Sequence, residues 1–351
     1  MRRGQLRSTL YFQPRSREAH RGGRAYEPEQ GCAQKLVLPD PRGLHRLSHF
    51  GRGAGAGRLA PLPHPMAHRS WLLVPADNDA KLAKVPAVGA DVVVLDLAAV
   101  AERNKLEARE HAVTFMTKMQ RQLTAKKPFA QWVRINPIGS PHWKDDLIAA
   151  MAQKPAGIVL PRAMGPQQVQ MLAAEIYELE QGGPAAHNST RILPQVGDAP
   201  EAALMISDFA KDPHPRIIGL SWDAGALAAA SHMNTVDNDA IRAIRAQLLL
   251  TAKARGLLAI ESPSGLVKRQ EALEAVVNRA RINGFDGMMA RHPAQIAAID
   301  KAFAPTEEEL VAARAILSAF ELHPEAQVLT VDGRAVDRIG LERARRLLDA
   351  G

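Results

Sequence analysis

Two stretches of this chain decide its fold. Residues 191–198 read Arg-Ile-Leu-Pro-Gln-Val-Gly-Asp, and residues 216–227 read Arg-Ile-Ile-Gly-Leu-Ser-Trp-Asp-Ala-Gly-Ala-Leu. Each is an apolar run of strand length with Gly and Asp near its end and an Ala-rich segment after it, which is typical of a strand followed by a helix. In a parallel barrel the carboxyl ends of the strands carry the chemistry. We therefore expect function to be decided near Gly197, Asp198, Asp223 and Ala226.

The same pattern recurs along most of the chain. The predicted strands are residues 70–76, 91–97, 131–136, 157–163, 191–197, 216–223, 257–263 and 287–292, and helical periodicity marks residues 105–122, 166–180, 200–211, 240–255 and 266–280. Strands that are apolar throughout are buried on both faces, as in a parallel sheet covered by helices. An open doubly wound sheet would need a glycine-rich loop after its first strand, and residues 76–79 are Ala-Asp-Asn-Asp. We predict a TIM (β/α)8 barrel over residues 66–304.

The basic charge belongs to the amino-terminal segment. Residues 1–65 hold 12 Lys and Arg against 4 Asp and Glu, which leaves 33 of each sign in the rest of the chain, out of totals of 45 and 37. This segment lacks amphipathic periodicity, so we predict a disordered basic leader, with Met66 as the working start. An Arg-rich transit peptide is the weaker alternative. The neutral body argues against a nucleic-acid partner, and no apolar run is long enough for a membrane span.

Residues 305–351 form a predicted carboxy-terminal arm. Thr306 precedes three glutamates, as at a capped helix start, and helical periodicity continues to residue 321. A strand at residues 328–331, a turn at Asp332-Gly333 and a basic amphipathic helix follow. The arm is too small to fold alone, so we expect it to dock on the barrel or on a neighbouring subunit.

Several motifs in fixed order resemble the citrate lyase beta-subunit family, the HpcH/HpaI-type aldolases that include malyl-CoA and citramalyl-CoA lyases. The matching stretches are Arg69-Ser70, Val74-Pro75, residues 89–91, residues 95–97, Lys105 with Arg109, residues 133–136, residues 157–161, residues 284–287, residues 292–296 and residues 331–337. The resemblance implies the barrel fold and cleavage or formation of the carbon–carbon bond of a 3-hydroxyacyl-CoA. It also implies a small-molecule acyl-CoA or oxo acid as ligand, and a homo-oligomer, a trimer or hexamer.

The resemblance assigns roles to some residues of this chain, and at other family site positions the expected acidic residue is missing. It implies Mg²⁺ as the cofactor, a CoA thioester as the substrate, Arg134 as the carboxylate-binding arginine and Asp337 as the catalytic aspartate, brought by the arm of the same or an adjacent subunit. The metal-binding glutamate of strand five falls on Gly197, and the acidic pair after strand six falls on Gly225 and Ala226. No metal ligand therefore stands at the family positions.

Asp198 and Asp223 are the remaining candidates for metal ligands. Adjacent strand residues point to opposite faces, which argues against Asp198 as a simple replacement for Gly197. Asp198 also precedes Ala199-Pro200, and capping of the following helix is the favoured interpretation.

Other charged residues complete the predicted site. Glu261 ends strand seven, where it would act as an acid or base or brace Arg134 or Arg162. Arg69, Arg134, Arg162 and Lys105 are the predicted substrate-binding side chains. Lys105 and Arg109 lie four residues apart, so they would meet a CoA phosphate or form a solvated basic face. For Arg134 the alternative to substrate binding is an internal salt bridge to Asp96. For Asp96 the favoured interpretation is that it braces a neighbouring loop.

Two functions remain open from the sequence. The first is a cytoplasmic carbon–carbon lyase that keeps Arg134 and Asp337. The second is a pseudoenzyme or binding subunit that keeps an acyl-CoA or oxo-acid pocket without Mg²⁺-dependent turnover.

Overall fold

The computed structural model describes residues 68–121, 128–183, 185–211 and 213–348. The predicted leader, residues 1–65, lies outside the described residues. Among the described helices, none combines the length and apolar character that a membrane crossing requires.

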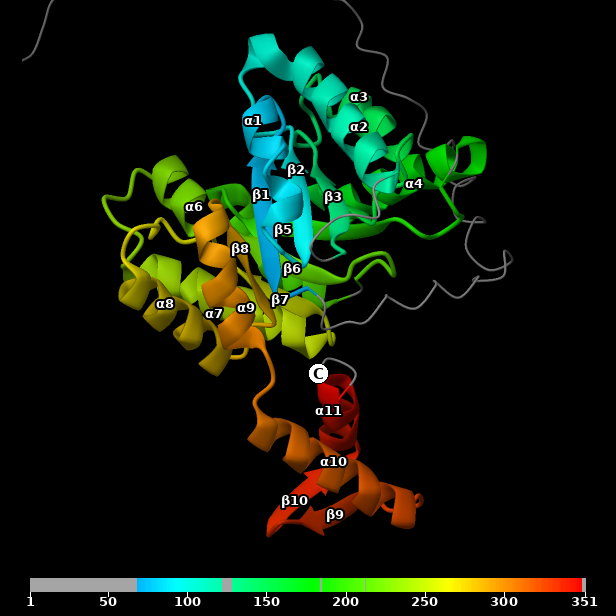
Figure 1. The fold of residues 1–351 in the computed structure, drawn as a ribbon, viewed down its shortest axis with the longest axis vertical. Helices are drawn as coiled ribbons and strands as arrows, with labels where there is room; N and C mark the ends of the chain where they lie inside the picture. Colours follow the sequence, from blue (N-terminus) through cyan, green and yellow to red (C-terminus); the bar gives the residue numbers. More distant parts are fainter. Residues whose placement is uncertain (1–67, 122–127, 184, 212, 349–351) are drawn as a thin grey trace, which may run out of the picture. The chain divides into compact units, whose positions relative to one another are not determined.

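Eight parallel strands close into a barrel in sequence order (Figure 1). They are β1 Ser70–Pro75, β2 Val92–Asp96, β3 Ala130–Arg134, β4 Gly157–Leu160, β5 Arg191–Gly197, β6 Gly219–Trp222, β7 Leu258–Glu261 and β8 Gly287–Ala290. Pairing of Trp71 with Met289 joins the first strand to the last. The predicted TIM barrel is confirmed, and the carboxyl ends of all eight strands meet at one mouth.

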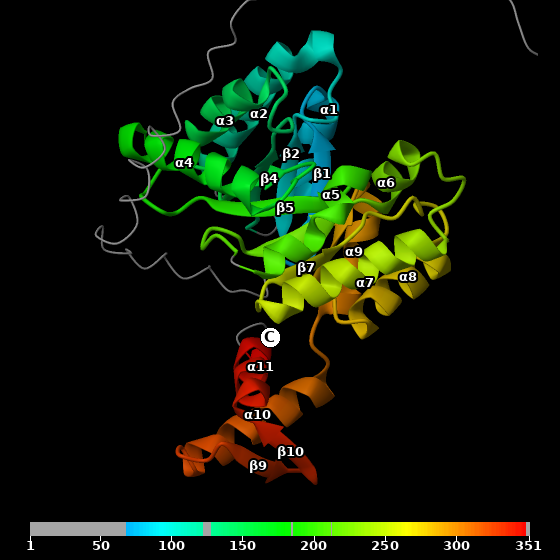
Figure 2. The ribbon, with the colours of Figure 1, turned by 180° about the vertical axis from the view of Figure 1, so that it is seen from behind.

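Helices cover the outside of the barrel (Figure 2). They are α1 Asp79–Leu82, α2 Lys105–Arg121, α3 Trp143–Met151, α4 Pro166–Gly182, α5 Pro200–Leu204, α6 Ala224–Ala230, α7 Asp239–Ala254, α8 Gln270–Ile282 and α9 Ile296–Phe303, with short 3-10 turns at Val85–Ala87, Glu102–Asn104, Ile206–Ala210 and Pro293–Gln295. The sequence analysis missed α1, α3 and α9. The helix expected at residues 200–211 is divided into α5 and a 3-10 turn.

Alternation along the strands separates two apolar layers. The inner layer fills the barrel and consists of Trp71, Leu73, Val92, Val94, Trp132, Val159, Leu193, Ile218, Ile260 and Met289. The outer layer packs the strands against the helices. Trp132 explains one glycine, because a Cβ at Gly157 would lie 2.3 Å from its ring.

The arm contains α10 Glu307–Leu322, the antiparallel hairpin β9 Val328–Val331 and β10 Arg334–Asp337, and α11 Arg338–Leu348. Thr306 and Glu309 form the expected capping box of α10. Asp332 and Gly333 both have positive φ (49° and 75°), which suits a tight two-residue hairpin turn. The second strand of this hairpin was not predicted. Phe320 and Leu341 are buried within the arm, where α10 packs against α11.

Candidate active site

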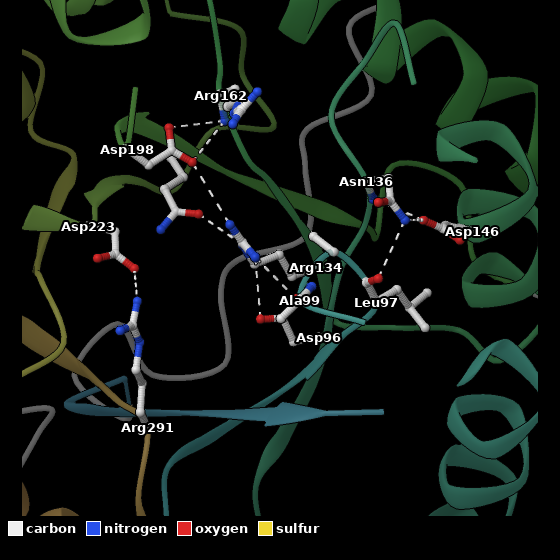
Figure 3. A network of polar contacts seen from close by, with 12 residues as sticks. Asp96, Leu97, Ala99, Arg134, Asn136, Asp146, Arg162, Asp198, Asp223 and Arg291 are labelled. Carbon is white, nitrogen blue, oxygen red and sulfur yellow. Dashed lines mark hydrogen bonds and ion pairs between the residues drawn. The ribbon is translucent and has the colours of Figure 1, made fainter. Parts of the chain in front are cut away.

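Charged side chains gather at the carboxyl ends of the strands, above the inner apolar layer. Figure 3 shows Asp96, Arg134, Arg162 and Asp198 joined by hydrogen bonds and ion pairs in this region, and a separate pair formed by Asp223 and Arg291. They come from β2, β3 and the segments that follow β4, β5, β6 and β8. The strands converge here, so residues far apart in the sequence form one polar cluster.

Arg134 is the central cation of this cluster. Its Nε donates to Gln195 Oε1 at 2.9 Å, and its Nη1 donates to both carboxylate oxygens of Asp96 at 3.1 and 3.3 Å. Its side chain is only 16% exposed. Burial acts to lower the pKa of Arg134, but the neighbouring carboxylates, Asp96 first, raise that pKa above its ordinary value. The predicted salt bridge to Asp96 is present, and a role in substrate binding stays a prediction.

A β-bulge in β5 turns Asp198 toward Arg134. Gln195 pairs with Ser221 and Gly197 with Trp222, so β5 has one more residue than β6 at this point. The bulge breaks the two-residue alternation, which lets both Gln195 and Asp198 face Arg134. The Asp198 carboxylate lies 3.9 Å from Arg134 Nη2. A Cβ at Gly197 would instead meet Trp222 Cβ at 3.1 Å and Ile244 at 3.2 Å, in the outer layer.

The predicted helix cap at Asp198 is wrong. The N-cap of α5 is Ala199, and no side chain caps this helix. The Asp198 carboxylate instead accepts hydrogen bonds from the backbone N–H of Arg162, at 3.1 and 3.2 Å. Burial raises the pKa of Asp198 to about 6, against the opposing effect of Arg134.

Asp223 caps the next helix and holds an arginine. Its Oδ1 accepts a hydrogen bond from Ala226 N at 3.0 Å at the start of α6. Its Oδ2 accepts from Arg291, which follows β8 and whose side chain is 55% exposed. Sequence reasoning argued a helix cap for Asp198 and not for Asp223, and it missed the arginine partner of Asp223.

Arg162 presents an exposed side chain at the end of β4. Its φ of 49° is unusual for a residue with a Cβ and orients its backbone N–H toward Asp198. This strained backbone places a guanidinium beside the polar cluster without burying it. Its predicted role in substrate binding stays untested.

Glu261 lies on the outer side of the barrel. It follows the inward-facing Ile260, so alternation turns it toward the helix layer. Its Oε1 accepts from Trp222 Nε1 at 2.8 Å, and its Oε2 accepts from Arg245 of α7 at 2.6 Å. Glu261 therefore braces Arg245, not Arg134 or Arg162. Its predicted role as acid or base is untested, and these contacts favour a structural role.

Lys105 braces the loop after β2. Its Nζ donates to Leu97 O at 2.8 Å, to Ala98 O at 3.3 Å and to Asn136 Oδ1 at 2.8 Å. Lys105 is buried, and burial lowers its pKa. Arg109 likewise binds Asp146 at 2.7 Å. The expected solvated basic face is therefore wrong for Lys105, and CoA binding by these side chains stays a prediction.

Arg69 and Asp337 belong to other parts of the fold, the amino end of β1 and the arm. Arg69 precedes β1, at the amino ends of the strands, and its Nε binds Asp91 at 2.9 Å. This position is at the opposite end of the barrel from the mouth, so we leave Arg69 out of the proposed site. Asp337 ends β10, is exposed, and accepts a hydrogen bond from Gly340 N at 2.8 Å. Its predicted place beside Arg134 is not tested.

Two residues of the cluster were missed from the sequence, and each carried a signal. Gln195 is a polar residue inside the apolar run of β5, and Arg291 directly follows the apolar β8. A buried strand rarely ends in such groups unless they find polar partners.

The chain matches the family model described as HpcH/HpaI aldolase/citrate lyase over residues 69–293. The chain belongs to this family. The citrate lyase subunit beta-like protein of Mycobacterium tuberculosis is 30% identical over 285 residues, which cover 79% of this chain and 93% of that protein. The mitochondrial citramalyl-CoA lyase of Rattus norvegicus is 27% identical over 299 residues, which cover 80% of this chain and 85% of that protein.

Solved structures of the family agree with the barrel. The protein CitE from Mycobacterium tuberculosis, in complex with magnesium, acetoacetate and coenzyme A, matches with a TM-score of 0.59 and 29% identity over 82% of this chain and 99% of that chain. The citrate lyase beta subunit complexed with oxaloacetate and magnesium, from the same organism, matches with a TM-score of 0.55 and 29% identity over 69% of this chain and 99% of that chain.

The residues at the mouth of this chain do not fit a hard divalent cation. Among the residues that the structure describes, no group of three or more His, Cys, Asp or Glu side chains is placed to hold a metal ion. Asp198 binds a peptide N–H and faces Arg134, and Asp223 is paired with Arg291. Magnesium prefers several free oxygen ligands with surplus negative charge, which these paired carboxylates do not supply.

Proposed function

We propose that this protein acts on a 3-hydroxyacyl-CoA at the barrel mouth and cleaves, or forms, the carbon–carbon bond next to the thioester. Membership of the family supports a CoA-ester lyase-like function, because relatives carry the names citramalyl-CoA lyase and citrate lyase subunit beta-like protein. The observation that carries the proposal is the buried Arg134 guanidinium, held by Asp96 and Gln195 at the mouth.

Arg134 would bind the carboxylate of the oxo-acid half. A buried guanidinium forms strong, directional hydrogen bonds with carboxylates. Gln195 fixes Nε and Asp96 fixes Nη1, while the 3.9 Å separation of Nη2 from Asp198 is longer than a hydrogen bond. Nη2 is therefore the donor that an incoming carboxylate can engage, with Arg162 exposed nearby.

The reaction also needs a group that moves a proton at the enolate carbon. Asp337 is our proposed acid and base, delivered by the arm of the same chain or of a second copy. This assignment implies a homo-oligomer if the second copy supplies it. We further propose a cytoplasmic location, although the relatives include mitochondrial proteins.

A binding protein without turnover is the alternative. Glu261 is engaged by Trp222 and Arg245, and the mouth does not fit a divalent cation. If Asp337 does not reach the mouth, the pocket lacks the acid and base proposed here, and binding of an oxo acid without turnover is expected.

Incubation of the full chain with malyl-CoA, citramalyl-CoA and citryl-CoA tests the proposal. Carbon–carbon cleavage releases an oxo acid and a shorter acyl-CoA, whereas thioester hydrolysis releases free CoA. The distinction matters because another relative, 27% identical, is named (3S)-malyl-CoA thioesterase. We expect oxo acid from at least one substrate, dependent on Arg134. Binding without product would favour the alternative.

A further inference from the structure

The carboxylates at the barrel mouth are matched by guanidinium groups. Asp96 and Asp198 face Arg134, Asp223 is paired with Arg291, and the peptide N–H of Arg162 binds Asp198. Three aspartates thus share the mouth with three arginines. Among these six described residues, no excess of negative charge remains to offset a divalent cation.

Arg291 stands beside a position where the family resemblance predicts an acidic side chain. A Cβ at Gly225 would lie 3.4 Å from Asp223 Oδ1 and 4.0 Å from Arg291 Nη1. With glycine at position 225, no side chain from this position competes with Asp223 for the Arg291 guanidinium. A second substituted position, Gly197, faces the outer layer and offers nothing to the mouth.

Arg291 also has donors to spare. A guanidinium carries five N–H groups, and the contact with Asp223 uses Nη2. Its side chain is 55% exposed, so the remaining donors are open to a ligand. Asp223 in turn belongs to the Arg134 cluster electrostatically, because its charge helps to raise the pKa of Arg134 and of Asp198.

We propose that Arg291 is a ligand-binding residue that, together with Arg134, holds the oxygens of a short oxo acid directly, so that this pocket binds its anionic ligand without a divalent cation. The inference rests on the proposed function, because it concerns the same pocket. In this proposal the Arg291 side chain neutralises the charge of the ligand, as a bound cation would otherwise do. Arg291 is suited to this because a guanidinium matches the planar, paired oxygens of an oxo acid.

Calorimetric titration of the full chain with pyruvate, and separately with acetoacetate, tests the proposal. Each titration is run in EDTA and again in millimolar magnesium. We expect the same affinity in both buffers, to within about twofold. In EDTA we expect Arg291→Gln to weaken binding by at least about tenfold, as for loss of one partner of a charge-assisted contact.

Arg279→Gln is the matched control. Arg279 is exposed near the end of α8, so this variant makes the same charge change away from the mouth and should bind like the unmodified protein. Gly225→Glu serves if Arg291→Gln does not fold, because its carboxylate would compete for Arg291 and weaken binding in EDTA while the cation beside the buried Asp223 is kept.

The outcomes separate this inference from the proposed function. Binding that requires magnesium, or unchanged affinity in Arg291→Gln or Gly225→Glu, overturns the role of Arg291 and leaves the lyase proposal standing. Absence of oxo-acid binding in both buffers, together with absence of product from all three thioesters, overturns both.

Discussion

The Asp198 carboxylate lies 3.9 Å from Nη2 of Arg134, although Asp198 directly follows β5, Arg134 ends β3, and Asp198 lies three positions after the inward-facing Gln195. Regular alternation would turn Asp198 away from Arg134. The bulge in β5 reverses it and places a carboxyl group with a raised pKa next to a permanent cation.

Asp198→Asn should remove a pH-dependent loss of stability. The pKa of Asp198 is about 6 in the folded protein, against an ordinary value of 3.8, so the folded state binds the proton more tightly. Stability from this group is greatest at low pH and falls as pH rises from about 4 to about 6. Between about pH 4.5 and 7.5 we expect Asp198→Asn to gain about 2 kcal/mol relative to the unmodified protein, measured by urea unfolding. A constant difference between the two proteins across this range would contradict the shift.

Arg134→Met should destabilise the barrel by about 3 to 5 kcal/mol, because it leaves the buried Asp96 and Asp198 without their cation. Combining it with Asp198→Asn should recover part of the loss, because one of the two uncompensated charges is then removed. The double-mutant cycle from urea unfolding gives the coupling directly. Additive effects would show that Asp198 and Arg134 do not interact.

Glu261→Gln should lower stability and leave ligand binding intact. The amide oxygen can still accept the Trp222 Nε1–H, but the ion pair with Arg245 is lost, which costs about 1 to 3 kcal/mol. Thermal unfolding and oxo-acid affinity are measured on the same preparation. A large loss of turnover with unchanged stability would instead restore Glu261 as an acid or base.

Asp337→Asn should abolish any lyase activity while preserving the arm. An asparagine side chain can still accept the Gly340 N–H, so the change removes charge but keeps the helix cap. If Asp337 acts in the pocket of a neighbouring copy, mixing Asp337→Asn with Arg134→Lys protomers should restore part of the activity. Full activity in Asp337→Asn alone would exclude this residue from catalysis.

The barrel could be predicted because its strands are apolar throughout and alternate with helices at regular intervals. The short helices α1, α3 and α9 were missed, and so was β10, which depends on pairing with β9. The site was predicted less well, because it depends on side-chain direction. Glu261 faces outward because of its place in the alternation of β7, and Asp198 faces inward because of the bulge in β5. Neither direction is visible in the sequence. The Asp223–Arg291 pair joins residues 68 positions apart, and no local pattern indicates it.

The most direct measurement is a titration of the full chain with Mn²⁺, followed by the EPR signal of the free ion. Because Asp198 and Asp223 are already matched by Arg134 and Arg291, we predict that the protein binds no Mn²⁺ with micromolar affinity. Stoichiometric micromolar binding that disappears in Asp198→Asn or Asp223→Asn would contradict this and would place a divalent cation at the barrel mouth.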